Sequence, residues 1–349
     1  MRLRLAFIFA TLLIVAAACT QPQDTQTQAS PSPPSAELQG EAESLTIYSG
    51  RGENLVGPIF EKFQTETGIT LNVKYGDTAE LAALILEEGS NSPADLFFAQ
   101  DAGGLGAVAK EGLFVDLPSD LLDLVPEAFA ADNGQWVGIS GRSRVIVYNT
   151  ESVKEADLPA SIDGFTDERW KGRVGWSPTN GSFQSFVTAY RKVKGDAAAR
   201  DWLNAMRAND AKVYEGNSPI VKAVGAGEIQ VGLVNHYYLL NIKKDEPDIT
   251  AANHFYSNGG PEVLVNVAGA GILKSSRAQK TAGELIDFLL SSEGQEYFVQ
   301  ETSEYPLIEG VDPLPTLPAL SELDSPDIDL SDLDDLEGTL ELLRQAGLI

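Results

Sequence analysis

The chain has 349 residues, of which 51 are Asp or Glu and 25 are Lys or Arg, so its formal net charge is −26. A protein this acidic is not expected to bind nucleic acid, because phosphate binding needs a basic surface. Its only cysteine, Cys19, lies near the N-terminus, so an intrachain disulfide and a metal site built from several cysteines are both excluded.

The first residues predict an export signal. A short basic stretch at residues 1–4 is followed by an apolar run, residues 5–18, which is too short to span a bilayer. We therefore interpret residues 1–18 as a signal peptide. No later stretch is long and apolar enough to cross a membrane.

Cys19 follows three alanines directly, and this arrangement resembles a lipobox, in which the cysteine is acylated and becomes the mature N-terminus. The residue three places before the cysteine is Ala16, where a leucine is usual. Lipidation of Cys19 predicts a protein held by its lipid anchor alone, in the periplasm or on the outer face of the cytoplasmic membrane. The alternative is an ordinary cleaved signal peptide and an unmodified thiol.

Residues 19–44 predict a flexible tether. They are rich in Gln, Thr, Ser, Pro and Ala and contain one large aliphatic residue, Leu38. Such a segment buries too little surface to offset the entropy of ordering it. Folded sequence is expected from Leu45 onward, and the remaining residues, about 300, suffice for two lobes with separate cores.

Short β-rich runs and amphipathic helical patterns alternate after Leu45. In chain order we expect a strand at 45–48, a helix at 54–67, a strand at 71–75, a helix at 78–88 and a strand at 94–98. A strand at 173–176, helices after Ser182 and at 197–208, a strand at 231–234, and helices at 278–290 and 336–346 follow. Strands separated by helices favour βαβ units around a parallel sheet, so the fold class is α/β.

Several expected strands end in loops of small and polar residues. These loops comprise residues 49–53, 100–101, 178–182 and 235–238. Ligands of open α/β sheets bind beyond the carboxyl ends of the strands, so the four loops predict a cleft between two α/β lobes.

These same loops resemble those of the periplasmic ferric-ion-binding proteins, the bacterial transferrins. The likeness rests on seven strings that occur in order and span most of the chain after the tether: LTIYSGRGENLVGPIFEKFQTETGI, EEGSNSPADLFFAQ, SGRSRVIVYNT, WKGRVGWSPTNGSF, EGNSPIVKAVGAGEIQVGLVNHYY, GAGILKSS and EYPL. The most specific of them is NHYY, at residues 235–238.

The resemblance implies a type II periplasmic binding-protein fold, with two α/β lobes joined by a hinge. Residues 45–142 with about 268–318 would form the N-terminal lobe, and residues 143–267 with about 319–349 the C-terminal lobe. It also implies a monomer that closes on Fe(III) and delivers it to an ABC permease.

The resemblance places Tyr237 and Tyr238 as the metal ligands. Their chemistry suits the ion, because Fe(III) is a hard cation that prefers anionic oxygen, and a bound cation can remove a phenol proton at neutral pH. Neighbouring residues of a regular strand point to opposite faces. Both tyrosines can therefore reach one ion only if the chain turns just after residues 231–234.

The chain departs from the family pattern at the other ligands. Gly52 stands where a histidine is common, and Glu53 follows it at a position where some members have a tyrosine. Gln100 occupies the position of the usual carboxylate, with Asp101 beside it as an oxygen donor or, alternatively, as the cap of the next helix. A third tyrosine that some members carry at 180–182 is absent. Glu53, Asp101 and Gln100 are therefore weaker candidates.

The resemblance also implies a synergistic anion, carbonate or phosphate. Helix starts favour negative charge, which suits residues 180–182. The anion-site candidates are Asn180, Gly181, Ser182, Asn217, Asn235, Arg142 and Arg51, with Arg144 as a further counter-charge.

A second hypothesis is the same fold binding an organic or inorganic anion, such as a phosphonate or phosphate ester, without iron. An enzyme is not expected, because the chain has two histidines, one cysteine and none of the usual nucleophile or phosphate-binding motifs. We expect structural roles for His236, His254, Tyr48 and Tyr148.

Overall fold

The computed structural model describes residues 37–349. The predicted signal peptide, Cys19 and the tether up to residue 36 lie outside the described residues. The strands are β1 (Ser44–Ser49), β2 (Thr70–Tyr75), β3 (Leu96–Ala99), β4 (Val137–Asn149), β5 (Val174–Trp176), β6 (Lys212–Val213), β7 (Val231–Asn235), β8 (Ala251–His254) and β9 (Val265–Ile272). The α-helices are α1 (Glu53–Thr67), α2 (Thr78–Glu88), α3 (Ala102–Lys110), α4 (Ser119–Leu122), α5 (Gly181–Lys194), α6 (Asp196–Ala208), α7 (Asn217–Gly225), α8 (Tyr237–Asp245), α9 (Gln279–Leu290), α10 (Ser292–Tyr297) and α11 (Leu336–Gln345).

The sheet is mixed rather than purely parallel. Its strand order is β2-β1-β3-β9-β4-β7-β5-β6, and β8 pairs with β4. The βαβ units predicted from the sequence are present, since β1 runs parallel to β2 and β3, and β5 runs parallel to β6 and β7. The antiparallel pairs all involve β4 or β9.

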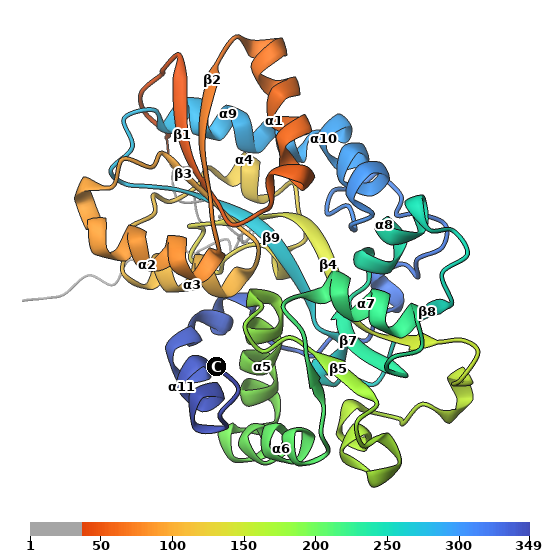
Figure 1. Cartoon of the computed structure of the whole chain (residues 1–349). Helices are drawn as coiled ribbons and strands as arrows, with labels where there is room; N and C mark the ends of the chain where they lie inside the picture. Colours follow the sequence, from red (N-terminus) through yellow and green to blue (C-terminus); the bar gives the residue numbers. More distant parts are fainter. Residues whose placement is uncertain (1–36) are drawn as a thin grey trace, which may run out of the picture. The chain divides into compact units, whose positions relative to one another are not determined.

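The long strands β4 and β9 connect the two halves of this sheet, as Figure 1 shows. Residues of β4 up to Ser143 pair with β9, and those from Arg144 onward pair with β7. Every residue of β4 is buried. Burial on both faces removes the alternation of polar and apolar residues that marks a half-exposed strand.

Three apolar clusters fill the described part of the chain. The largest packs β1, β3, β9 and the helices α1, α2, α3 and α9. A second contains the aromatic group around Trp176 and Trp202, and a third joins β4 and β7 to α7. The lobe boundaries that the sequence suggests stay a prediction.

Residues 37–43, which the sequence analysis assigns to the tether, lie against α9. Leu38 fills the space beside Gly283, because a Cβ atom added to Gly283 would lie 2.5 Å from the Cδ1 of Leu38. The backbone N–H of Ala42 donates to the hydroxyl of Thr281, and Lys280 pairs with Glu41. These contacts order the chain before the expected start at Leu45.

The C-terminal segment contacts helices of both halves of the sheet. Its short helix η9 (Leu330–Asp334) packs on α3, where Lys110 pairs with Asp334 at 3.0 Å. The following helix, α11, packs on α5. Asp335, which follows Asp334 directly and caps the start of α11, accepts a hydrogen bond from Arg191 of α5 at 2.7 Å.

Candidate functional site

The chain turns directly after β7, as the tyrosine pair requires. Asn235 ends the strand, His236 stands at the helix start, and Tyr237 and Tyr238 are the first residues of α8. Their rings stack with centroids 4.3 Å apart and planes 27° apart. Because consecutive residues are about 100° apart around a helix axis, and not on opposite faces as in a strand, the two rings can lie side by side.

The two tyrosines are buried to different degrees, and the phenol of Tyr238 has a raised pKa. Tyr237 is 1 % exposed, and Tyr238 is partly exposed. Burial raises the pKa of the Tyr238 phenol well above its usual value of 10, and the adjacent Tyr237 raises it further. Arg51 and Tyr238 lie near the Tyr237 hydroxyl, but no hydrogen bond of good geometry reaches it.

Three buried arginines surround the pair. Arg51, from the loop after β1, lies with its guanidinium carbon 5.9 Å from the centre of the Tyr237 ring. It pairs with Glu304 at 2.7 Å in a fully buried ion pair. Burial opposes the charge of Arg51, but Glu304 and the two tyrosines raise its pKa overall.

Arg142 and Arg144 come from the part of β4 where pairing passes from β9 to β7. The Nη2 of Arg142 donates to the carbonyl of Val267, whereas its Nε and Nη1 are buried without a partner. The Nη1 of Arg144 donates to Asn235 at 3.1 Å, and burial lowers the pKa of Arg144 to about 9. Arginine stays protonated at neutral pH even so, which leaves a buried charge without a carboxylate.

The other anion-site candidates lie at the start of α5 and at Asn217, the first residue of α7. The side-chain oxygen of Asn180 accepts from the Ser182 hydroxyl at 2.6 Å, the Ser182 N–H at 3.1 Å and the Asn217 amide at 3.2 Å. Arg144 reaches the same helix, where its guanidinium lies 5.3 Å from the centre of the Phe186 ring. The predicted anion-site residues therefore form two groups, one beside the tyrosines and one at the start of α5. Arg144 contacts Asn235 in the first group and lies against Phe186 of the helix α5.

Asp101 caps α3, accepting from the N–H of Gly104 at 3.2 Å, which was the alternative that the sequence left open. Its other oxygen extends toward Gly181, the first residue of α5. Burial raises the pKa of Asp101, although the charge of Arg142 and a hydrogen bond from Ser185 oppose that rise.

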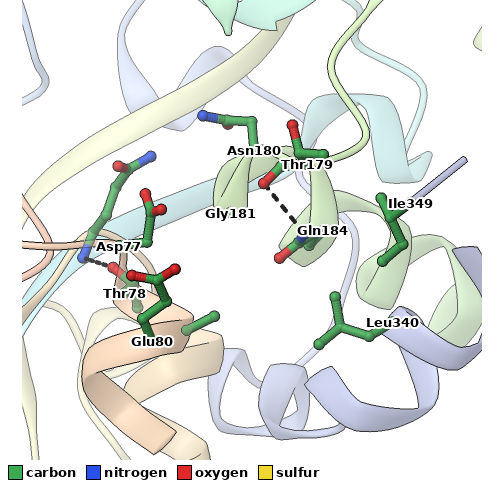
Figure 2. Close-up of a pocket in the computed structure, with 11 residues that line it drawn as sticks. Asp77, Thr78, Glu80, Thr179, Asn180, Gly181, Gln184, Leu340 and Ile349 are labelled. Carbon is green, nitrogen blue, oxygen red and sulfur yellow. Dashed lines mark hydrogen bonds between the residues drawn. The ribbon is translucent and has the colours of Figure 1, made fainter. Parts of the chain in front are cut away.

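A pocket of about 330 Å³ opens between the starts of α2 and α5. Figure 2 shows Asp77, Thr78 and Glu80 on one side of it and Asn180 and Gly181 on the other. Gln100 also lines this pocket, with its side-chain N–H₂ group unpaired. The tyrosines do not line it. Glu53 is exposed in the first turn of α1, and no contact described here joins it to the tyrosine pair.

Among residues 37–349, no three side chains from His, Cys, Asp and Glu gather as a metal site. Tyr48 and Tyr148 are buried within strands, and His254 pairs with Glu155. Sequence reasoning missed Glu304, which opens the string EYPL but lies 253 residues from its partner Arg51. No local pattern could have indicated that pairing.

His236 fixes the turn that carries the tyrosines. Its Nδ1 accepts from the N–H of Ser143 at 3.2 Å, so its Nε2 carries the proton and donates to the carbonyl of Ser303 at 2.9 Å. Burial lowers the pKa of His236 to about 4, although Ser303 and Glu304 oppose this effect.

We expect His236 to make the protein less stable in acid. The unfolded histidine takes up a proton below about pH 6.5, whereas the folded one stays neutral down to about pH 4. The free energy of unfolding should therefore fall by about 3 kcal/mol as the pH drops through that window. Urea unfolding of the wild type and of His236→Gln across the window measures this. An equally steep loss in the variant would contradict the assignment.

The chain matches the model of a known family, bacterial extracellular solute-binding protein, over residues 59–324. It is 33 % identical to an Fe(3+)-binding periplasmic protein of Serratia marcescens, over 90 % of this chain and 93 % of that protein. Among solved structures, it is similar to iron-bound HitA from Pseudomonas aeruginosa, with 37 % identity and a TM-score of 0.83 over 87 % of this chain and 99 % of the other. It is also similar to a Trichodesmium protein (IdiA, FutA) in complex with iron and citrate, with 28 % identity and a TM-score of 0.73 over 88 % and 100 %.

The chain belongs to the family of bacterial extracellular solute-binding proteins. Its fold is the type II periplasmic binding-protein fold, as the sequence predicts, and its relatives include periplasmic proteins named for ferric iron. Within the described residues, no helix is long and apolar enough to cross a membrane.

Proposed function

We propose that this protein captures ferric iron through the phenolate oxygens of Tyr237 and Tyr238, together with a synergistic anion, and delivers it to an ABC permease. One observation carries the proposal: two stacked tyrosines lie near three buried arginines from other segments of the chain, Arg51, Arg142 and Arg144. A buried hydroxyl without a hydrogen-bond partner is costly, and the Tyr237 hydroxyl is such a group, so it is suited to bind a ligand.

Iron binding would proceed by exchange of protons for metal. Burial raises the pKa of the Tyr238 phenol, so this group is protonated before a metal binds. A trivalent cation reverses that preference, because its charge stabilises the phenolates far more than burial disfavours them. Arg51 and Arg144 lie near both phenols and favour the same deprotonated form.

The synergistic anion would compensate the arginines. Three guanidinium groups face two carboxylates, Glu304 and Asp101, and the pKa of Asp101 is raised by burial. Positive charge therefore predominates before iron enters, and more so afterwards. Carbonate or phosphate held by Arg142, Arg144 and Asn235 would remove this excess, and citrate, which accompanies iron in the Trichodesmium relative, offers the same carboxylate oxygens.

The remaining iron ligands would be oxygen atoms from the anion, from water or from Asp101. Asp101 is the better candidate of the two acids, because it is buried and its charge interacts with that of Arg142, whereas Glu53 is exposed. Gln100 borders the neighbouring pocket and is a weaker candidate still.

Loading the purified protein with ferric citrate tests the proposal. Tyrosinate bound to Fe(III) absorbs visible light by charge transfer, so we expect a coloured protein with one iron for each chain. A colourless protein that retains no iron after gel filtration would overturn it.

We expect Arg144→Gln to weaken anion binding by at least about tenfold, because a charge-assisted hydrogen bond would be lost. Titration calorimetry with carbonate, phosphate and citrate, each with and without iron, measures the effect. Arg169→Gln serves as the control, because Arg169 is an exposed arginine that donates to the backbone carbonyl of Asp157. Equal anion affinities in Arg144→Gln and the wild type would contradict the role of Arg144.

The excess of buried arginine also favours the second function, binding of an anion such as a phosphonate or phosphate ester without iron. The same titrations separate the two. Tight anion binding that is unaffected by iron, in a protein that stays colourless, would establish the second function instead.

We also infer that the protein is exported and anchored by a lipid on Cys19, outside the described residues, as a monomer at the outer face of the cytoplasmic membrane or in the periplasm. The periplasmic location of its relative supports export. Cys19→Ser should release the protein from the membrane fraction, while retention of the variant there would contradict the anchor.

A further inference from the structure

The orientation of Tyr237 is set by what packs on its ring. Because its hydroxyl has no hydrogen bond of good geometry, that group cannot fix the side chain. Three groups make ring or cation contacts with it: the ring of Tyr238 at 4.3 Å, that of His236 at 5.8 Å and the guanidinium of Arg51 at 5.9 Å. Fixing these groups therefore helps to fix the ring of Tyr237.

Two of the three neighbours are held by consecutive residues of one segment. The carbonyl of Ser303 accepts from Nε2 of His236 at 2.9 Å, and the carboxylate of Glu304 accepts from Nη2 of Arg51 at 2.7 Å. His236 and Arg51 come from distant parts of the chain, so Ser303 and Glu304 bring together two groups that nothing local connects.

This segment is itself firmly held. It follows a π-helix, η7 (Phe298–Thr302), and Ser303 adopts a left-handed conformation with φ of 60°, which is uncommon for a residue with a side chain. The second oxygen of Glu304 accepts from Ser140 at 2.8 Å and from Thr302 at 3.2 Å. π-helical turns and strained backbone occur often at functional sites.

The side chain of Ser303 bonds in turn to the helix that carries the tyrosines. Its hydroxyl donates to Asn241 of α8 at 3.0 Å, and the Asn241 amide donates back to the carbonyl of Thr302 at 3.0 Å. The segment thus contacts α8 at Asn241 as well as the two groups that flank the Tyr237 ring.

We propose that Ser303 and Glu304 form a positioning clamp that holds Tyr237 in its iron-binding orientation by fixing His236 and Arg51 against its ring. The proposal rests on the function proposed above. Glu304 acts here as a positioning residue and not as a ligand, because it is 0 % exposed and both its oxygens are already bonded. With the clamp formed in the empty protein, iron meets a tyrosine that is already oriented.

Glu304→Gln tests the clamp, since it keeps the size of the side chain and removes its charge. We expect iron affinity to fall by at least about tenfold, as for other residues that orient metal ligands, and the charge-transfer band to shift. Glu262→Gln is the matched control, because Glu262 is also buried, at 3 % exposure, and contacts Ile162 and Asn258 instead of the cluster. That variant should keep wild-type affinity and band position.

The iron-free proteins supply a second measurement that does not depend on the proposed function. In crystals of iron-free Glu304→Gln, the Tyr237 ring should be displaced or spread over several positions, and it should be ordered in Glu262→Gln. Arg51→Lys, which retains the cation but not the forked donor, should disorder the ring as well if Glu304→Gln does not fold.

The outcomes are distinguishable. A wild type that binds no iron would overturn the proposed function, while the position of the Tyr237 ring would still decide the clamp. An ordered ring and wild-type iron affinity in folded Glu304→Gln or, where that variant does not fold, in Arg51→Lys would overturn the clamp alone.

Discussion

Replacing either tyrosine with phenylalanine is expected to reduce the affinity for ferric iron by roughly 1000-fold or more, because each change removes a ligand directly and loss of an outer-shell partner alone costs 10- to 100-fold. The visible absorption of the iron-loaded protein should vanish in the double variant Tyr237→Phe, Tyr238→Phe. Competition against citrate measures the affinity, and the absorption spectrum reports the bond itself.

The fold should tolerate these changes. The Tyr237 hydroxyl has no partner, so removing it loses no hydrogen bond and should alter the free energy of unfolding by less than about 1 kcal/mol. Tyr305→Phe is the matched control, because Tyr305 is buried and its hydroxyl is also unpaired. Colour and affinity that persist in the double variant would exclude the tyrosines as ligands.

Iron uptake is expected to release about two protons for each ion, one from each phenol, so affinity should rise by about 100-fold for each unit of pH where both phenols begin protonated. The sign follows from the pKa of Tyr238, which is raised in the empty site, so this phenol is neutral at neutral pH. Acid therefore favours release of the ion, and alkali favours capture.

Calorimetry in buffers with different protonation enthalpies counts these protons. Tyr238→Phe should release one proton fewer than the wild type, which separates the phenols from protons lost by the anion. An affinity that is independent of pH between about pH 6 and pH 8 would contradict deprotonation of the tyrosines on binding.

Local patterns in the sequence predict several helices and parallel strands well, but not α3, α7 and α8. The helix expected at 78–88 is α2 with the same bounds, and the strand expected at 71–75 is β2, one residue longer at its start. Such elements carry their own signals, namely amphipathic periodicity and flanking glycines. The strands β4 and β9 are buried along their whole length, so they lack a periodic signal, and with them the mixed character of the sheet went unpredicted.

The candidate site likewise has one part that the sequence predicts and another part that it does not. The turn after β7 follows from the stereochemistry of two adjacent tyrosines, and the structure contains it. The contacts between Arg51 and Glu304 and between His236 and Ser303 depend on tertiary packing of segments far apart in the chain. A single sequence contains no pattern that pairs them, and the metal-ligand roles stay predictions.

The adjacent aspartates of the C-terminal segment pair with two different helices, α3 and α5. Consecutive Cα atoms are about 3.8 Å apart, yet Asp334 is paired with α3 and Asp335 with α5. The starts of these two helices carry Asp101 and Asn180. A motion that separates α3 from α5 would therefore strain these two ion pairs, whose partly exposed side chains attract each other less as the salt concentration rises.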